Sequence, residues 1–125
     1  MNKPLIVIAD ADSIVAQAYA DDSNHKLVLG LAQKLHDQRA HILFPATAIA
    51  EAVTTLQRKF PDPHLAASTL EVFTEIGVSI ENIDDEVIRE ARKLFDPNKS
   101  KQNTFFDCIV ATEAKKHHAD AIFSL

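Results

Sequence analysis

The sequence is poor in cysteine and glycine, and it contains no low-complexity stretch and no internal repeat. Its single cysteine, Cys108, cannot form a disulfide within the chain, so a reducing compartment is expected. The apolar run at residues 4–9 is too short for a secretion signal or a membrane span, and no other segment qualifies. We therefore expect a soluble, cytoplasmic protein with no membrane partner.

Positive charge is also scarce, since 13 Lys and Arg residues stand against 18 Asp and Glu residues, which gives a net charge of −5. This balance argues against a broad, nonspecific affinity for nucleic acid. It does not exclude a small metal-dependent nuclease site. Clustered acids are negative when they are counted without their ion, and the bound ion reverses the local sign of charge.

The length of 125 residues suits one domain with a hydrophobic core, and a hydrophobic share of 46% is ordinary for a globular protein. Apolar patterning and turn residues predict strands that alternate with helices. In chain order these are a strand at 5–9, helices at 14–20 and 26–39, a strand at 41–44, helices at 45–59 and 64–76, a strand at 78–83, helices at 84–95 and 104–118, and a strand at 121–125. Such alternation predicts an α/β fold, a three-layer α/β/α sandwich with a central parallel sheet.

Two acidic residues come soon after predicted strands. Asp10 directly follows the strand at residues 5–9, and Glu51 closely follows the strand at 41–44. Ligands of parallel sheets bind at the carboxyl ends of strands, so a site is expected at that edge. Structural alternatives stay open: Asp10 can be only a helix cap, Glu51 can be a solvated residue, and Asp12 can cap the helix, face the site or do both.

Asp107 has mostly apolar neighbours in the last predicted helix, among them Phe106 and Cys108. An ionised carboxylate in such surroundings is costly unless it is paired, and a bound cation is a suitable partner. A structural salt bridge to Lys99, Lys101 or Arg58 is the alternative.

Three segments resemble the motifs of the PIN-domain family, namely residues 10–13, 48–53 and 105–112. Their order, spacing and flanking residues are similar to that family over nearly the whole chain, and the size resembles that of VapC-type toxins of toxin–antitoxin pairs. The resemblance implies a single PIN-like domain over residues 1–125 with Mg²⁺- or Mn²⁺-dependent ribonuclease activity. It also implies an RNA substrate, an antitoxin partner and a homodimer.

By position, Asp10, Glu51 and Asp107 match the first three acids of the family, so the resemblance implies that they bind the metal and are catalytic. Asp12 falls where the family often has Asn or Asp. The fourth acid of the family usually comes just after the last strand, whereas this sequence has Leu125 as its last residue. We therefore expect the natural chain to continue past Leu125, with another acid or amide within a few residues.

Carboxylate oxygens suit the chemistry that the resemblance implies, because hard cations prefer them as ligands. A bound ion acidifies a water molecule into a nucleophile and shields the charge that develops on the phosphate oxygens. Lys99, Lys101 and Arg58 are candidates to hold an RNA phosphate, although each can equally be a solvated residue. We expect the six histidines to be structural or surface residues, since none of them is spaced from another as a metal-ligand pair.

A haloacid-dehalogenase-type phosphatase is the main competing enzyme, because residues 10–13 also resemble its Asp-x-Asp opening. Asp10 would then be the nucleophile and Asp12 the acid. That family also needs a downstream lysine and an acidic pair after a strand, whereas Asp84 and Asp85 open a predicted helix. Hydrolysis of para-nitrophenyl phosphate would favour this phosphatase.

Two further alternatives concern binding and signalling. A phosphate-receiver domain matches the length and the early acids, but it needs an Asp after the middle strand, where this chain has residues 44–47 without one. A catalytically inactive PIN fold could act only as a binding module. Metal-dependent cutting of RNA favours the nuclease over both.

Overall fold

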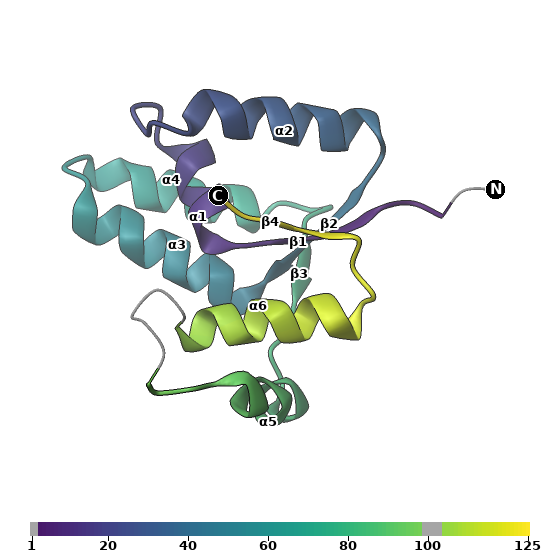
Figure 1. Cartoon of the computed structure of the whole chain (residues 1–125). Helices are drawn as coiled ribbons and strands as arrows, with labels where there is room; N and C mark the ends of the chain where they lie inside the picture. Colours follow the sequence, from purple (N-terminus) through teal and green to yellow (C-terminus); the bar gives the residue numbers. More distant parts are fainter. Residues whose placement is uncertain (1–2, 99–103) are drawn as a thin grey trace.

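The computed structural model of the chain describes residues 3–98 and 104–125 (Figure 1). In chain order its elements are β1 (Ile6–Ala9), α1 (Ala11–Ala18), α2 (His25–Asp37), β2 (His41–Pro45), α3 (Ala46–Lys59), α4 (Pro63–Phe73), β3 (Ser79–Glu81), α5 (Asp85–Leu94), α6 (Phe105–Lys116) and β4 (Ala121–Phe123). Each strand and helix that the sequence predicts is present, with ends shifted by a few residues. Every helix in the described ranges is too short or too polar to cross a lipid bilayer.

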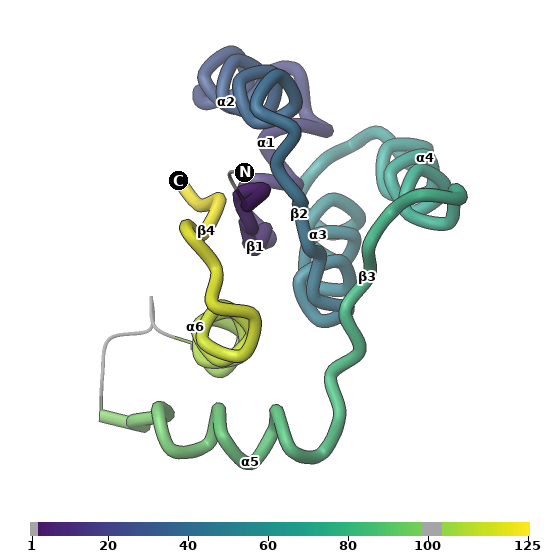
Figure 2. Tube along the Cα trace, turned by 90° about the vertical axis from the view of Figure 1, so that its right-hand side faces the viewer, coloured from purple at the N-terminus to yellow at the C-terminus, as the bar shows by residue number. Residues whose placement is uncertain are grey.

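The strands form one parallel sheet in the order β3-β2-β1-β4. The last strand lies beside the first, and Val7 pairs with Ala121. Figure 2 looks nearly along the strands and shows α1 and α2 on one side of β1 and β4, with α5 and α6 on the other side. The prediction of an α/β/α sandwich with a central parallel sheet is therefore confirmed.

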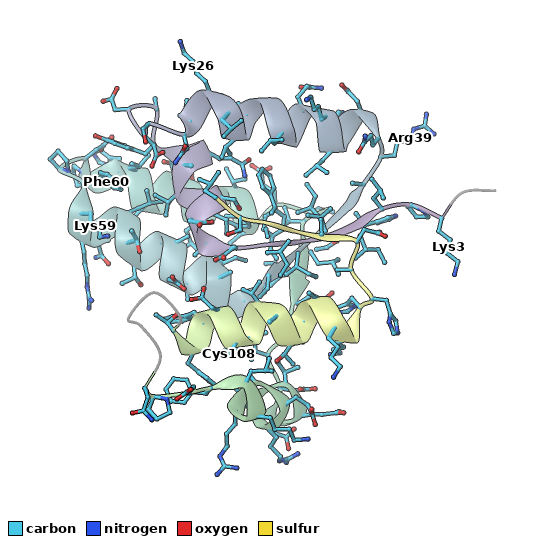
Figure 3. The ribbon with its side chains drawn as sticks, viewed as in Figure 1. Lys3, Lys26, Arg39, Lys59, Phe60 and Cys108 are labelled. Carbon is cyan, nitrogen blue, oxygen red and sulfur yellow. The ribbon has the colours of Figure 1, made fainter. Side chains whose placement is uncertain are left out.

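Apolar residues from both helix layers fill the interior. Val7 of β1 packs with Val28 of α2, and both side chains are almost fully buried. In the other layer, Ile109 of α6 packs against Val87 of α5. Cys108 borders this second cluster and lies on the side of α6 that faces α5 (Figure 3). These contacts hold α5 against α6.

Hydrogen bonds at helix caps and between neighbouring strands decide where several elements begin and end. The first helix starts at Ala11 because Asp10 already serves as its N-cap, earlier than the predicted start at residue 14. The edge strands β3 and β4 are shorter than predicted because each has only one neighbouring strand. The ladder of β3 ends where Pro45 pairs with Glu81, at the end of β2. The pairing of β4 likewise stops where β1 ends, at the pair Ala9 and Phe123.

Candidate active site at the carboxyl edge of the sheet

Asp10 is fixed at the point where β1 becomes α1. Its backbone N–H donates to the Phe123 carbonyl at 3.0 Å, which continues the pairing of β1 with β4. Its side-chain Oδ1 accepts from the Ala11 N–H at 2.6 Å, and its carbonyl accepts from Ser13 Oγ at 2.8 Å. Asp10 is thus a helix cap, as one alternative predicts. Its second carboxylate oxygen, Oδ2, takes no part in this capping and contacts Ser124 instead.

Ser124 brings Asp10 and Asp12 together. Its Oγ lies 3.3 Å from Asp10 Oδ2 and 3.4 Å from Asp12 Oδ2, so the hydroxyl can donate to either carboxylate. Asp12 Oδ2 also accepts from the Leu125 N–H at 3.3 Å. Sequence reasoning did not single out Ser124. The available signal was its place near the carboxyl end of the last predicted strand, at the edge where ligands of parallel sheets bind.

Glu51 lies on α3, partly buried, and faces the same acids. Burial, and after it the negative charges of Asp10, Asp107 and Asp12, together raise the pKa of Glu51 to about 7. Electrostatic coupling of this size requires that the carboxylates lie near one another in a poorly solvated place. The geometry therefore disfavours the alternative in which Glu51 is an ordinary solvated residue.

Asp107 lies in the first turn of α6, where its Oδ2 accepts from the Thr104 N–H at 2.9 Å. This bond orients the carboxylate at the start of the helix. In the described part of the chain, Asp107 makes no ion pair, so the alternative of a salt bridge to Arg58 is not seen. Lys99 and Lys101 lie outside the described residues.

The four acids fit a hard divalent cation by their chemistry. Burial also raises the pKa of Asp10 and of Asp12, so each carboxylate resists carrying its charge there. No salt bridge within residues 3–98 and 104–125 neutralises them. One turn before Glu51, the buried Thr47 Oγ1 has no hydrogen-bond partner among the described residues. The available donors are thus carboxylate oxygens without a cationic partner, which are the ligands that a hard divalent ion prefers.

The ligand oxygens of these acids are close, but they are not gathered around one point. Among the described residues, the group whose ligand atoms all lie within 4.8 Å of one another is a different one, formed by Glu81, Glu113 and His117. A single ion bound among Asp10, Glu51 and Asp107 therefore requires rotation of their side chains. Such rotations are inexpensive for partly exposed carboxylates.

Comparison with known proteins identifies the family. A sequence model of the PIN domain matches residues 7–125. The chain belongs to the PIN-domain family. The solved structure of the toxin VapC20 from Mycobacterium tuberculosis, which cleaves the sarcin–ricin loop, matches this PIN domain with a TM-score of 0.81. The match covers 95% of this chain and 88% of that chain at 13% sequence identity, so it establishes a shared fold. No curated protein sequence matches.

Membership in this family removes two of the competing interpretations. The resemblance of the three motifs to the PIN domain is confirmed, whereas the Asp-x-Asp opening of a phosphatase and the receiver domain have no support. Asp84 in this PIN domain caps α5 through its contact with the Val87 N–H at 3.0 Å. It does not contribute to the acid cluster.

His117 of this PIN domain is a structural residue, which is one of the two roles predicted for the histidines. Its Nε2 lies between the carboxylates of Glu81 and Glu113, and its side chain is only 24% exposed. The carboxylate partners of His117 were not predicted from the sequence. The available signal was the four-residue spacing of Glu113 and His117, which places both on one helix face.

Proposed function

We propose that this PIN domain is a Mg²⁺- or Mn²⁺-dependent endoribonuclease and the toxin of a toxin–antitoxin pair, acting in the cytoplasm. The observation that carries the proposal is the gathering of four acids at the carboxyl edge of the sheet. Asp10 and Asp12 both lie at hydrogen-bond distance from Ser124 Oγ, and the charges of Asp10, Asp107 and Asp12 add to burial in raising the pKa of Glu51. None of the four acids has a basic partner among the described residues. A divalent cation would stabilise this arrangement.

In this proposal Asp10, Glu51 and Asp107 hold the ion. When bound, Mg²⁺ or Mn²⁺ supplies positive charge for the phosphate oxygens and a water acidic enough to attack the phosphodiester. Asp10 is rigid because its backbone is paired to β4, and Asp107 is oriented by the Thr104 N–H. The main chain at both positions is therefore held in place, and side-chain rotations are enough to gather the carboxylates around an ion.

Asp12 and Ser124 have a supporting role. The Ser124 hydroxyl lies within hydrogen-bond distance of both carboxylates at the start of α1, so it can donate to either of them. Arg58 is exposed in the last turn of α3 and can hold an RNA phosphate, and Lys99 and Lys101 are candidates for the same role. The labelled cations Lys3, Lys26, Arg39 and Lys59 point in different directions and form no shared patch (Figure 3). The RNA contact should therefore be local to the acids.

The partner proposal rests on the likeness to VapC20, a toxin, together with the family. An antitoxin segment would block the acids, and a cationic side chain such as Arg would replace the charge of the metal there. We also propose a homodimer. A catalytically inactive PIN fold that only binds a partner is the competing proposal.

The test is cleavage of single-stranded RNA by the purified chain with Mg²⁺ or Mn²⁺, and again with excess EDTA. Asp10→Asn and Glu51→Gln should abolish the metal-dependent cleavage. Asp21→Asn and Glu75→Gln are matched controls, because both residues are exposed and make no side-chain hydrogen bond or ion pair among the described residues. Cleavage that persists in EDTA or in the Asp10 and Glu51 variants would refute the metal mechanism. Metal binding without cleavage would favour the binding module.

A further inference from the structure

A second group of metal-ligand atoms lies at the opposite end of α6 from Asp107. His117 is the C-cap of α6, Glu113 lies one turn before it, and Glu81 is the last residue of β3. His117 Nε2 is 3.1 Å from Glu113 Oε2 and 3.2 Å from Glu81 Oε2. The same nitrogen thus faces both carboxylates. One ligand atom from each residue lies within 4.8 Å of the other two.

Glu113 is the member of this group that a simple ion pair does not explain. Its side chain is fully buried, and its Oε1 has no hydrogen-bond partner among the residues that the structure describes. Buried polar atoms are normally satisfied, and an unsatisfied carboxylate oxygen is costly. A protonated His117 offers one Nε2–H to two carboxylates, so it would leave Oε1 unpaired and the cluster negative. The pKa of Glu113 is raised, chiefly by burial.

We propose that Glu81, Glu113 and His117 form a second metal site, separate from the acids around Asp10, that binds a borderline divalent ion such as Zn²⁺. One imidazole nitrogen and two carboxylate oxygens are ligands that Zn²⁺ accepts, whereas Mg²⁺ prefers oxygen alone. Ligands held about 2.0–2.2 Å from a tetrahedral Zn²⁺ are about 3.3–3.6 Å apart. The contacts of His117 need to lengthen only slightly to reach that spacing.

The exposure of the ligand side chains and their distance from Asp107 are also compatible with a separate metal site. The side chains of His117 and Glu81 are each 24% exposed, so an ion can enter from solvent and keep a water as its fourth ligand. Asp107 and His117 are ten residues apart on one helix, which corresponds to about 15 Å. The ion would link the edge strand β3 to the end of α6. The site is independent of the proposed nuclease centre, and its role is structural.

The test uses the 125-residue chain carrying Asp107→Asn, which weakens the other metal site. Zn²⁺ is titrated by calorimetry, and thermal unfolding is followed with and without Zn²⁺. We expect one equivalent to bind and to raise the unfolding temperature. Glu81→Gln and His117→Gln should each lower the affinity at least about tenfold. Glu113 is buried, so Glu113→Gln can unfold the chain. The test therefore relies on Glu81 and His117, which are partly exposed.

The matched control is His118→Asn, which alters the adjacent exposed histidine at a backbone φ of 50° that Asn tolerates. This variant should bind Zn²⁺ like the parent. Mg²⁺ in excess should not displace the Zn²⁺. Unchanged Zn²⁺ affinity in the Glu81 and His117 variants, or no binding to the folded parent, would overturn the proposal. Either result would identify the cluster as a hydrogen-bonded ion pair, and neither would bear on RNA cleavage.

Discussion

Glu51→Gln removes one negative charge from the acid cluster while it keeps the size and shape of the side chain. In the folded protein the pKa of Glu51 is raised from 4.5 to about 7 by burial and by the charges of Asp10, Asp107 and Asp12. The folded state therefore binds the proton more tightly than the unfolded state does. The associated stability is fully present below about pH 4.5 and is lost as the pH rises through about 7. Glutamine does not titrate, so the variant escapes this loss.

The magnitude follows from the pKa. A change from 4.5 to about 7 corresponds to about 3 kcal/mol at roughly 1.36 kcal/mol per pKa unit. Glu51 is partly exposed, so water screens part of this effect, and we expect a gain of about 1–3 kcal/mol for the metal-free variant above pH 7. Near pH 4.5 the protonated wild-type side chain resembles Gln, and the two proteins should have nearly equal stability.

Urea denaturation in EDTA, at about pH 4.5 and about pH 8.5, measures this difference. Glu75→Gln, at an exposed position, is the control and should change stability little at either pH. Addition of Mn²⁺ at the higher pH should stabilise the wild type more than the Glu51 variant. The reasoning would be refuted by a variant less stable than the wild type at about pH 8.5, or by a gain that is the same at both pH values.

Four other perturbations test the fold and the site. Asp107→Asn should abolish RNA cleavage and leave the metal-free fold at least as stable, because the amide oxygen can still accept from the Thr104 N–H. A variant that is active but destabilised would show that Asp107 has only a structural role. Leu56→Ala should cost about 2–5 kcal/mol in urea denaturation, since Leu56 is fully buried. Asp84→Ala should cost about 1 kcal/mol through loss of the α5 cap at the Val87 N–H, and no loss would show that the cap is replaced by water. Expression of the active protein alone should arrest bacterial growth, whereas harmless expression of an active enzyme would remove the toxin role.

Much of the fold could be predicted because its determinants are local in sequence. The continuous apolar run before Asp10 predicts a buried strand, and the capping side chains of Asp62 and Asp84 mark the starts of α4 and α5. Gly77, with a φ of 99°, follows α4 and leads into β3. Alternation of strands and helices then predicts a parallel sheet. The exact strand ends were less predictable, because each edge strand stops where its single neighbour stops.

The candidate acid site could be predicted in part for the same reason. Parallel strands carry their carboxyl ends to one edge, so Asp10 and Glu51 were expected together, and the family motif added Asp107. The hydrogen bond that orients Asp107 involves Thr104, three residues earlier, and is a local helix-capping feature. Ser124 was missed because its contact with Asp10 joins residues 114 positions apart.

By itself, the sequence determined the elements, their parallel arrangement, the family and the acids that line the edge of the sheet. The elements depend on hydrophobic period and capping, which act over a few residues, and the family and the acids depend on motifs that can be read along the sequence without the fold. Only the tertiary structure decided that the pKa of Glu51 lies near 7 and that Glu81 meets His117 beside a buried Glu113. Both depend on burial and on distances between elements far apart in the chain. These quantities exist only once the helices have packed against the sheet and excluded water.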